Sequence, residues 1–113
     1  MQPTLSKTHT RALHILGFLF LRMGQFARAR RLFLALVALD PADLNARLSL
    51  AHAAIQLEDG EMALHTLTGI APDAPIPGGN AVVSLLLARA YTLVGDTNMA
   101  QEAMASFWKA KKA

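Results

Sequence analysis

The sequence lacks cysteine altogether and has no long apolar run. Without cysteine, neither a disulfide framework nor a thiolate metal site can form. The apolar run of residues 15–21 lies between His14 and Arg22 and is far shorter than the roughly 20 residues of a membrane-spanning helix. It continues into another helical pattern, whereas a signal peptide would end at a small-residue cleavage site. We therefore expect no membrane insertion and a location in the bacterial cytoplasm, where the chain is made.

Groups of residues that would carry catalysis or bind metal are also missing. No two of the four histidines have the three- or four-residue spacing that places two imidazoles on one helical face: His9, His14, His52 and His65. The acidic residues stand mainly where helices begin or turn, and capping explains them. Nothing resembles an activated nucleophile, a phosphate loop or a dinucleotide fingerprint. The sequence predicts a non-enzymatic protein with no cofactor and no metal.

The charge pattern argues against nucleic acid as a partner. The formal net charge is only +3, and the basic residues are scattered along the chain, with Arg28, Arg30 and Arg31 as the densest group. A nucleic-acid interface would need a basic face interleaved with aromatic side chains, and aromatic residues are only 6% of the chain. We expect no nucleic-acid binding.

What the sequence does contain is an internal repeat. The stretch of residues 10–41 recurs at an offset of 34 without a gap, so that small, bulky and turn positions align: Gly17 with Ala51, Ala29 with Ala63, Phe33 with Leu67, and Pro41 with Pro75. A third copy follows after three extra residues, with Ala88, Tyr91, Ala100 and Met104 at the positions of Gly17, Phe20, Ala29 and Phe33. A period of this size is typical of a helix pair that buries its apolar face only against neighbouring pairs.

Apolar periodicity and turn residues predict six helices after a loose lead-in over residues 1–7. The first helix starts near residues 6–10 and ends at Gly24, and the second covers 26–39. Asp40 is expected to cap the third, with Pro41 at its first position and its end near residue 57. Residues 58–60 form a turn, 61–70 the fourth helix and 71–79 a loop rich in proline and glycine. Asn80 is expected to cap the fifth helix, 81–94, and the sixth runs from 97 to about 109.

The repeat resembles the tetratricopeptide repeat. The first unit matches its signature at seven positions: Leu16, Gly17, Phe20, Gly24, Ala29, Phe33 and Pro41. The second unit keeps Leu50, Ala51, Ala63, Leu67 and Pro75, and the third keeps Leu87, Ala88, Tyr91, Gly95, Ala100 and Met104. The resemblance implies an all-α, short right-handed solenoid of three tetratricopeptide helix-turn-helix repeats. One domain, 1–113, would hold repeats at about 10–43, 44–77 and 81–113.

In tetratricopeptide arrays the first helix of each unit lines a concave groove, and the resemblance carries those positions onto this chain. They are Arg11, His14, Phe18, Leu21 and Arg22 in unit one, Asn45, Leu48, His52, Ile55 and Gln56 in unit two, and Val82, Leu85, Arg89, Thr92 and Leu93 in unit three. Their floor is mostly apolar, which is typical of a binding groove or an oligomer interface. The alternative is that some of these side chains belong to the core.

Two further features bear on the partner. A clamp for a terminal carboxylate would need lysine and asparagine where this chain has His14, Phe18, Leu48 and His52, so we expect an apolar helix or extended segment instead. Phe107 and Trp108 are neighbours on the last helix and point about 100° apart, so both cannot face one core. We therefore add Trp108 to the candidate contact residues.

The short array is similar to the tetratricopeptide chaperones of bacterial type III secretion, in size and layout to the YscY-like ones. That resemblance implies a chaperone that holds a small secreted or export-apparatus protein in a soluble, export-competent complex. The alternatives are a generic tetratricopeptide adaptor, or a self-associating scaffold whose groove is filled by a second copy, and the chain alone is expected to be able to form homo-oligomers.

Overall fold

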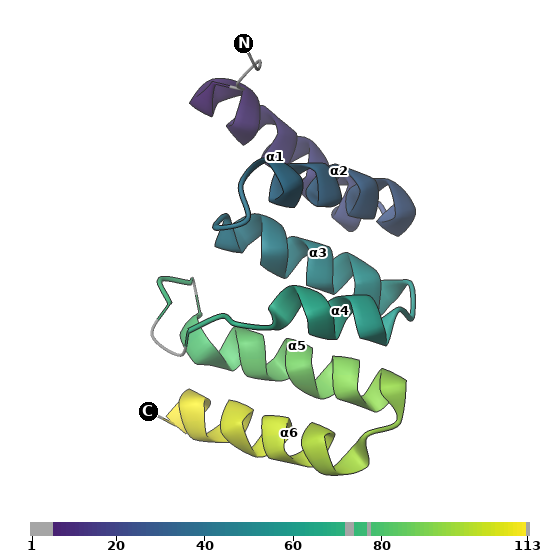
Figure 1. The fold of residues 1–113 in the computed structure, drawn as a ribbon, viewed down its shortest axis with the longest axis vertical. Helices are drawn as coiled ribbons and strands as arrows, with labels where there is room; N and C mark the ends of the chain where they lie inside the picture. The colour runs from purple at the N-terminus through teal and green to yellow at the C-terminus, as the bar shows by residue number, and fades with distance from the viewer. Residues whose placement is uncertain (1–5, 72–73, 77, 113) are drawn as a thin grey trace.

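The computed structural model describes residues 6–71, 74–76 and 78–112, and the regular structure in these ranges is entirely α-helical. Six helices follow one another along the chain: α1 (Lys7–Arg22), α2 (Phe26–Leu39), α3 (Leu44–Gln56), α4 (Gly60–Leu67), α5 (Gly79–Val94) and α6 (Thr97–Lys112). Each helix lies against the next in one continuous stack, from α1 at one end to α6 at the other (Figure 1).

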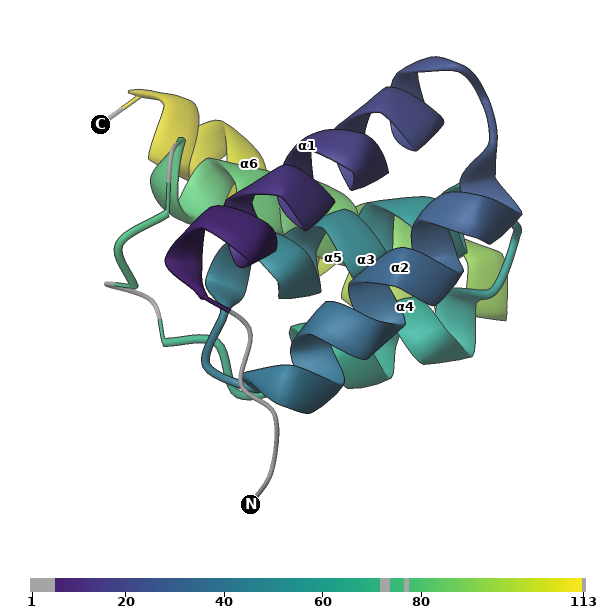
Figure 2. The same ribbon diagram turned by 90° about the horizontal axis from the view of Figure 1, so that it is seen from above.

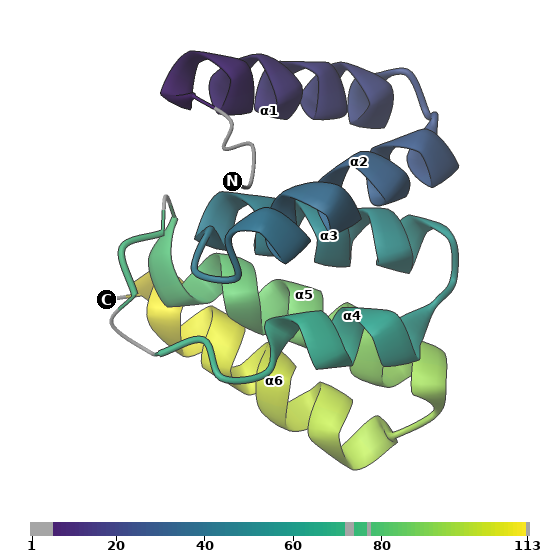
Figure 3. The same cartoon turned by 45° about the horizontal axis from the view of Figure 1, so that its top comes forward.

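The contacts between helices that are not consecutive show how the stack curves. α3 lies close to both α1 and α5, whereas no two of α2, α4 and α6 have Cα atoms within 8 Å of one another in the described residues. The first helices of the three pairs therefore form the inner side, and the second helices form the outer side (Figure 3). This arrangement confirms the prediction of an all-α helical-repeat solenoid.

The core has two parts that meet at α3, because α3 has a neighbouring helix pair on each side. Ala46, Leu50 and Ala53 face the first pair and join a cluster with Ala29, Phe33 and Leu36 of α2. Ala51, Ala54 and Ile55 face the other way and join Ala63, Leu67, Leu86 and Ala90. Alanine at so many of these positions lets the helix axes approach closely, as the repeat signature predicts.

The third unit departs from the packing that the repeat alignment predicts. Met104 aligns with the buried Phe33, yet it is exposed, and Ala103 is the buried residue of α6. α6 contacts only α5 among the described helices, so no following helix covers its other side. A bulky residue at this position therefore meets solvent instead of filling a gap between helices.

The start of α3 differs from the prediction. Asp40 does not cap this helix, and Pro41 is not in it: α3 begins at Leu44, and Asp43 is the N-cap, its Oδ1 accepting a hydrogen bond from Ala46 N at 3.1 Å. Asp40 instead accepts from Ala42 N at 3.1 Å and closes a tight turn over Pro41. Both aspartates suit a cap, and Asp43 is the one that also contacts α1.

Four other boundaries differ from the predicted ones. α4 starts at Gly60, which the sequence placed in the turn, and ends at Leu67, not at residue 70. The N-cap of α5 is Gly78 in the left-handed region, not Asn80. α6 continues to Lys112. Ser6 caps α1 through its Oγ, whereas the rest of the expected lead-in, residues 1–5, and loop residues 72, 73 and 77 lie outside the described part.

Within the described residues, none of the helices combines the length and the apolar character that crossing a membrane requires.

Candidate functional site

The inner side of the stack carries a groove made of three hollows that share walls. The first lies between α1 and the start of α3, the middle one between α1, α3 and α5, and the last between α3, α5 and α6. Phe18 and Asn45 line both the first and the middle hollow, and His52, Val82 and Leu86 line both the middle and the last. We call this continuous surface the concave groove.

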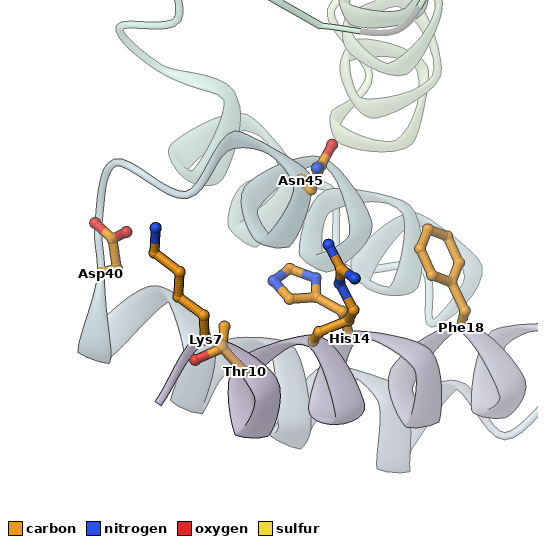
Figure 4. Close-up of a pocket in the computed structure, with 7 residues that line it drawn as sticks. Lys7, Thr10, His14, Phe18, Asp40 and Asn45 are labelled. Carbon is orange, nitrogen blue, oxygen red and sulfur yellow. The ribbon is translucent and has the colours of Figure 1, made fainter. Parts of the chain in front are cut away.

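The first hollow is the polar end of the concave groove. Lys7, His14 and Phe18 project from α1 toward the side where Asn45 of α3 lies (Figure 4). Thr10 and Arg11 complete the wall from α1, and Asp40 contributes from the turn before α3. Two cations and a single carboxylate thus surround this end.

The middle hollow is mostly apolar, and Phe18, Leu21, Leu48, Val82 and Leu86 line it together with Asn45, Ser49 and His52. Phe18 is 52% exposed, although its ring packs edge-on against the buried ring of Phe33 with centroids 6.4 Å apart. The buried α2 ring therefore supports an apolar side chain that stays open to the groove. Such a surface favours contact with another apolar group.

The last hollow is apolar in its floor and basic at its rim. Leu85 and Leu86 of α5 face Phe107 of α6, and Arg89 and Lys111 stand beside them. Among the residues lining this hollow there is no carboxylate. The concave groove therefore has an apolar centre with cations at both ends.

His14 connects the first two units. Its Nε2 lies 2.8 Å from Oδ2 of Asp43, and the same carboxylate caps α3 through its other oxygen. The His14 ring also lies 6.2 Å from the ring of Phe33, between centroids. The Asp43 side chain thus joins α1 to the first turn of α3. Because His14 is already bound to Asp43, its ring forms part of the groove wall and is less available for a polar contact with a partner.

His52 stands where the middle and last hollows meet. Its half-buried position lowers the pKa of the imidazole, because a charged ring would lose hydration, and the neighbouring Arg89 lowers it further by charge repulsion. The neutral imidazole is the favoured form, which suits contact with an apolar partner in the centre of the groove.

Most of the candidate contact residues meet in the concave groove, namely Arg11, His14, Phe18, Leu21, Asn45, Leu48, His52, Val82, Leu85 and Arg89. Ile55 does not: it is only 5% exposed and belongs to the core between α3, α4 and α5. Near its C-terminal end, α3 is covered on both sides by neighbouring helices. Ile55 is therefore buried, although the pattern taken from tetratricopeptide arrays places this position in the groove. The expectation that Ile55 faces the groove is therefore corrected.

Five other candidates lie outside the three hollows. Arg22 is exposed at the end of α1, and Gln56, Thr92 and Leu93 lie beyond the last turn that lines the groove. Trp108 is 57% exposed on α6, next to Phe107, whose ring lies inside the groove. Phe107, and not the predicted Trp108, is thus the one of these two neighbours that lines the groove.

Sequence reasoning missed several groove residues. Lys7 and Thr10 precede the first position of the repeat, although they fall seven and four residues before His14 and so on its face of the helix. Asp40 and Gly78 come from loops, and Lys111 from the last turn of α6. Helical spacing from His14 could have indicated Lys7 and Thr10, but no local signal marks the loop residues.

Among the residues that the structure describes, no three histidine, aspartate or glutamate side chains come together as a metal site would require. The polar groups that line the groove come from α1, α3, α5 and α6 and from the turn before α3.

Comparison with known proteins agrees with the repeat. The tetratricopeptide repeat family matches residues 20–75, which run from the second half of α1 to the loop after α4. No curated protein matches the chain. Tetratricopeptide repeats are modules of protein–protein interaction, and the concave groove is of a kind that fits such a role. The chain is thus an all-α helical-repeat protein with tetratricopeptide repeats in residues 20–75.

Proposed function

We propose that the chain is a non-enzymatic binding protein that holds a segment of a protein partner in the concave groove. The observation that carries the proposal is the continuity of the three hollows along α1, α3 and α5, with Phe18 and His52 as shared walls. A continuous groove suits an extended or helical segment that docks several side chains in a row.

The lining favours a particular partner chemistry. Apolar side chains of the partner would fit the middle hollow. Its acidic side chains would fit the two ends, because Lys7 and Arg11 line one end and Arg89 and Lys111 line the other. Acidic groups of the partner at these ends would speed association and fix its register, while the apolar centre supplies most of the affinity.

The finer proposal is that this partner is a small protein of bacterial type III secretion, kept in a soluble, export-competent complex. It is supported by the resemblance of the first unit and by the short array of three helix pairs. A generic adaptor and a self-associating scaffold remain the alternatives, and they predict a different partner or a second copy in the groove.

The test is co-expression with the reading frames that neighbour the gene, followed by affinity purification. We expect one small protein to co-purify, and we expect Leu85→Asp to weaken the complex about tenfold or more, since it places a charge in a desolvated contact. Leu34→Asp is the matched control, because Leu34 is similarly exposed but lies on α2 outside the groove.

Each alternative has its own outcome. Equal loss of the complex in both variants would refute the groove as the site, as would a complex that survives Leu85→Asp unchanged. A homodimer that Leu85→Asp dissociates, measured by light scattering, would favour the scaffold. A partner unrelated to secretion would favour the generic adaptor.

A further inference from the structure

A second apolar surface runs along the face of α1 that points away from α2 and α3, outside the concave groove. At 100° per residue, five apolar side chains fall within an arc of about 100° along this helix and its C-cap residue, Met23: Ala12, Ile15, Leu16, Leu19 and Met23. All five are exposed, and Met23 has 66% of its surface open. We call this surface the α1 stripe.

The α1 stripe lies at the open end of the stack. α1 contacts α2 and α3 through the opposite side, where Gly17 is buried against Phe33. Seen from above, α1 is the uppermost element, and no other described helix covers it (Figure 2). Within the stack, α3 has a neighbour on each side, whereas α1 has neighbours on one side only.

The spacing within the α1 stripe is that of a helix–helix seam. Ala12, Leu16, Leu19 and Met23 follow one another at four, three and four residues, with Ile15 beside them. Alternating spacings of three and four place side chains in the row that interlocks with a second helix. This pattern favours another helix as the occupant.

The charges around the α1 stripe decide what kind of helix fits. Residues 1–39 contain six basic side chains and no aspartate or glutamate. Arg11 and Arg22 stand along the border between the stripe and the groove, and neither forms an ion pair within the described part of the chain. A second copy docking through its own α1 would bring two such cationic surfaces together, which opposes that arrangement.

We propose that the α1 stripe docks an acidic amphipathic helix of a protein partner, which extends the stack by one helix. The apolar row of that helix packs on Leu16 and Leu19, and its carboxylates face Arg11 and Arg22. A lipid surface is less favoured, because the stripe is narrow and carries only a few cations beside it, each contributing about 1 kcal/mol at an anionic membrane. The apolar row of this surface lies outside the groove, and Arg11 stands at the border of both surfaces.

Two fluorescent synthetic peptides, each about as long as α1, test the proposal by anisotropy against the 113-residue chain. Both have the same leucine row, and one has glutamates beside it where the other has lysines. We expect the acidic peptide to bind at least about tenfold more tightly than the basic one, and its advantage to shrink as salt rises. No binding of either peptide at about 1 mM would overturn the proposal.

Variants locate the peptide. Leu19→Glu is expected to weaken binding about tenfold or more, whereas Leu34→Glu, with the same charge change on the same helical hairpin, should leave it within about twofold. Leu85→Asp in the groove should also leave it unchanged. Circular dichroism checks that the three variants keep their helix content.

Three results would overturn the assignment. The first is acidic-peptide binding that Leu85→Asp abolishes and Leu19→Glu spares, which would place the peptide in the groove. The second is a homodimer in sedimentation that Leu19→Glu dissociates, which would put a second copy on the stripe. The third is binding to phosphatidylserine vesicles that Leu19→Glu removes while neither peptide binds, which would make the stripe a membrane contact.

Discussion

Gly17 of α1 lies directly under the ring of Phe33 of α2. A Cβ placed on Gly17 would be 2.8 Å from Cε2 of that ring, a distance that real Cβ atoms essentially never show. Phe33 is completely buried, so the ring cannot swing into solvent. In the second unit the aligned residues are Ala51 and Leu67, a larger and a smaller side chain at the same contact.

This contact predicts that Gly17→Ala destabilises the protein. Alanine normally stabilises a helix relative to glycine, but here the ring must move, and we expect a loss of about 1–3 kcal/mol in the free energy of unfolding. The double variant with Phe33→Leu imitates the pair of the second unit and should cost less than the sum of the two single changes. Denaturant unfolding measures all three, and additive losses would contradict the predicted contact.

The hydrogen bonds of Arg47 lead to a second prediction about the free energy of unfolding. Its guanidinium donates to the carbonyl oxygen of Thr66 at 3.1 Å from Nε and 2.9 Å from Nη2, and also to that of Thr68. These carbonyls end α4, where the helix has no donors of its own. Arg47→Met should lower the free energy of unfolding by about 1–3 kcal/mol, because the carbonyls lose their partner.

Arg31→Met is the control for Arg47→Met, since Arg31 is exposed on α2. It should shift the melting temperature little. Similar losses in the two variants would mean that the bonds from Arg47 to α4 contribute nothing specific.

Replacing Glu58 by glycine should stabilise the fold. It has a φ of 60°, which makes it the one non-glycine residue with positive φ among the described residues. The aligned positions of the first and third units are Gly24 and Gly95, with φ of 73° and 82°. Glu58→Gly should therefore raise the free energy of unfolding by up to about 1 kcal/mol, because the left-handed backbone no longer strains a side chain. Thermal unfolding checks this, with Glu61→Gly in the first turn of α4 expected to do the opposite.

Acid should weaken the fold through His52. Burial first, and Arg89 second, lower the pKa of His52 in the folded state, so the unfolded chain binds the proton at higher pH. Stability contributed by the neutral ring is therefore complete above about pH 6.5 and decreases as the pH falls below that value. The difference in denaturant midpoint between about pH 7.5 and pH 5.5 should become smaller in His52→Gln.

Much of the fold follows from the sequence by itself. The offset of 34 residues aligns Gly17 with Ala51 and Phe33 with Leu67, and this alternation of small and bulky residues is enough to predict paired helices and their register. Gly24 and Gly95 mark two of the turns between paired helices, since glycine takes the left-handed conformation without cost. Local preferences also determine most of the residues on the inner side, because helical spacing places them on one face.

Tertiary contacts decided what local preference left open. Asp40 and Asp43 are both good capping residues, and the hydrogen bond between Asp43 and His14 of another helix accompanies the choice of Asp43. Ile55 and Leu48 are both apolar residues of α3, but Ile55 is closed in by α4 and α5, whereas Leu48 lines the groove. Which apolar side chain is buried depends on how neighbouring helices cross, and that geometry arises from packing between segments distant in the chain, which no local pattern contains.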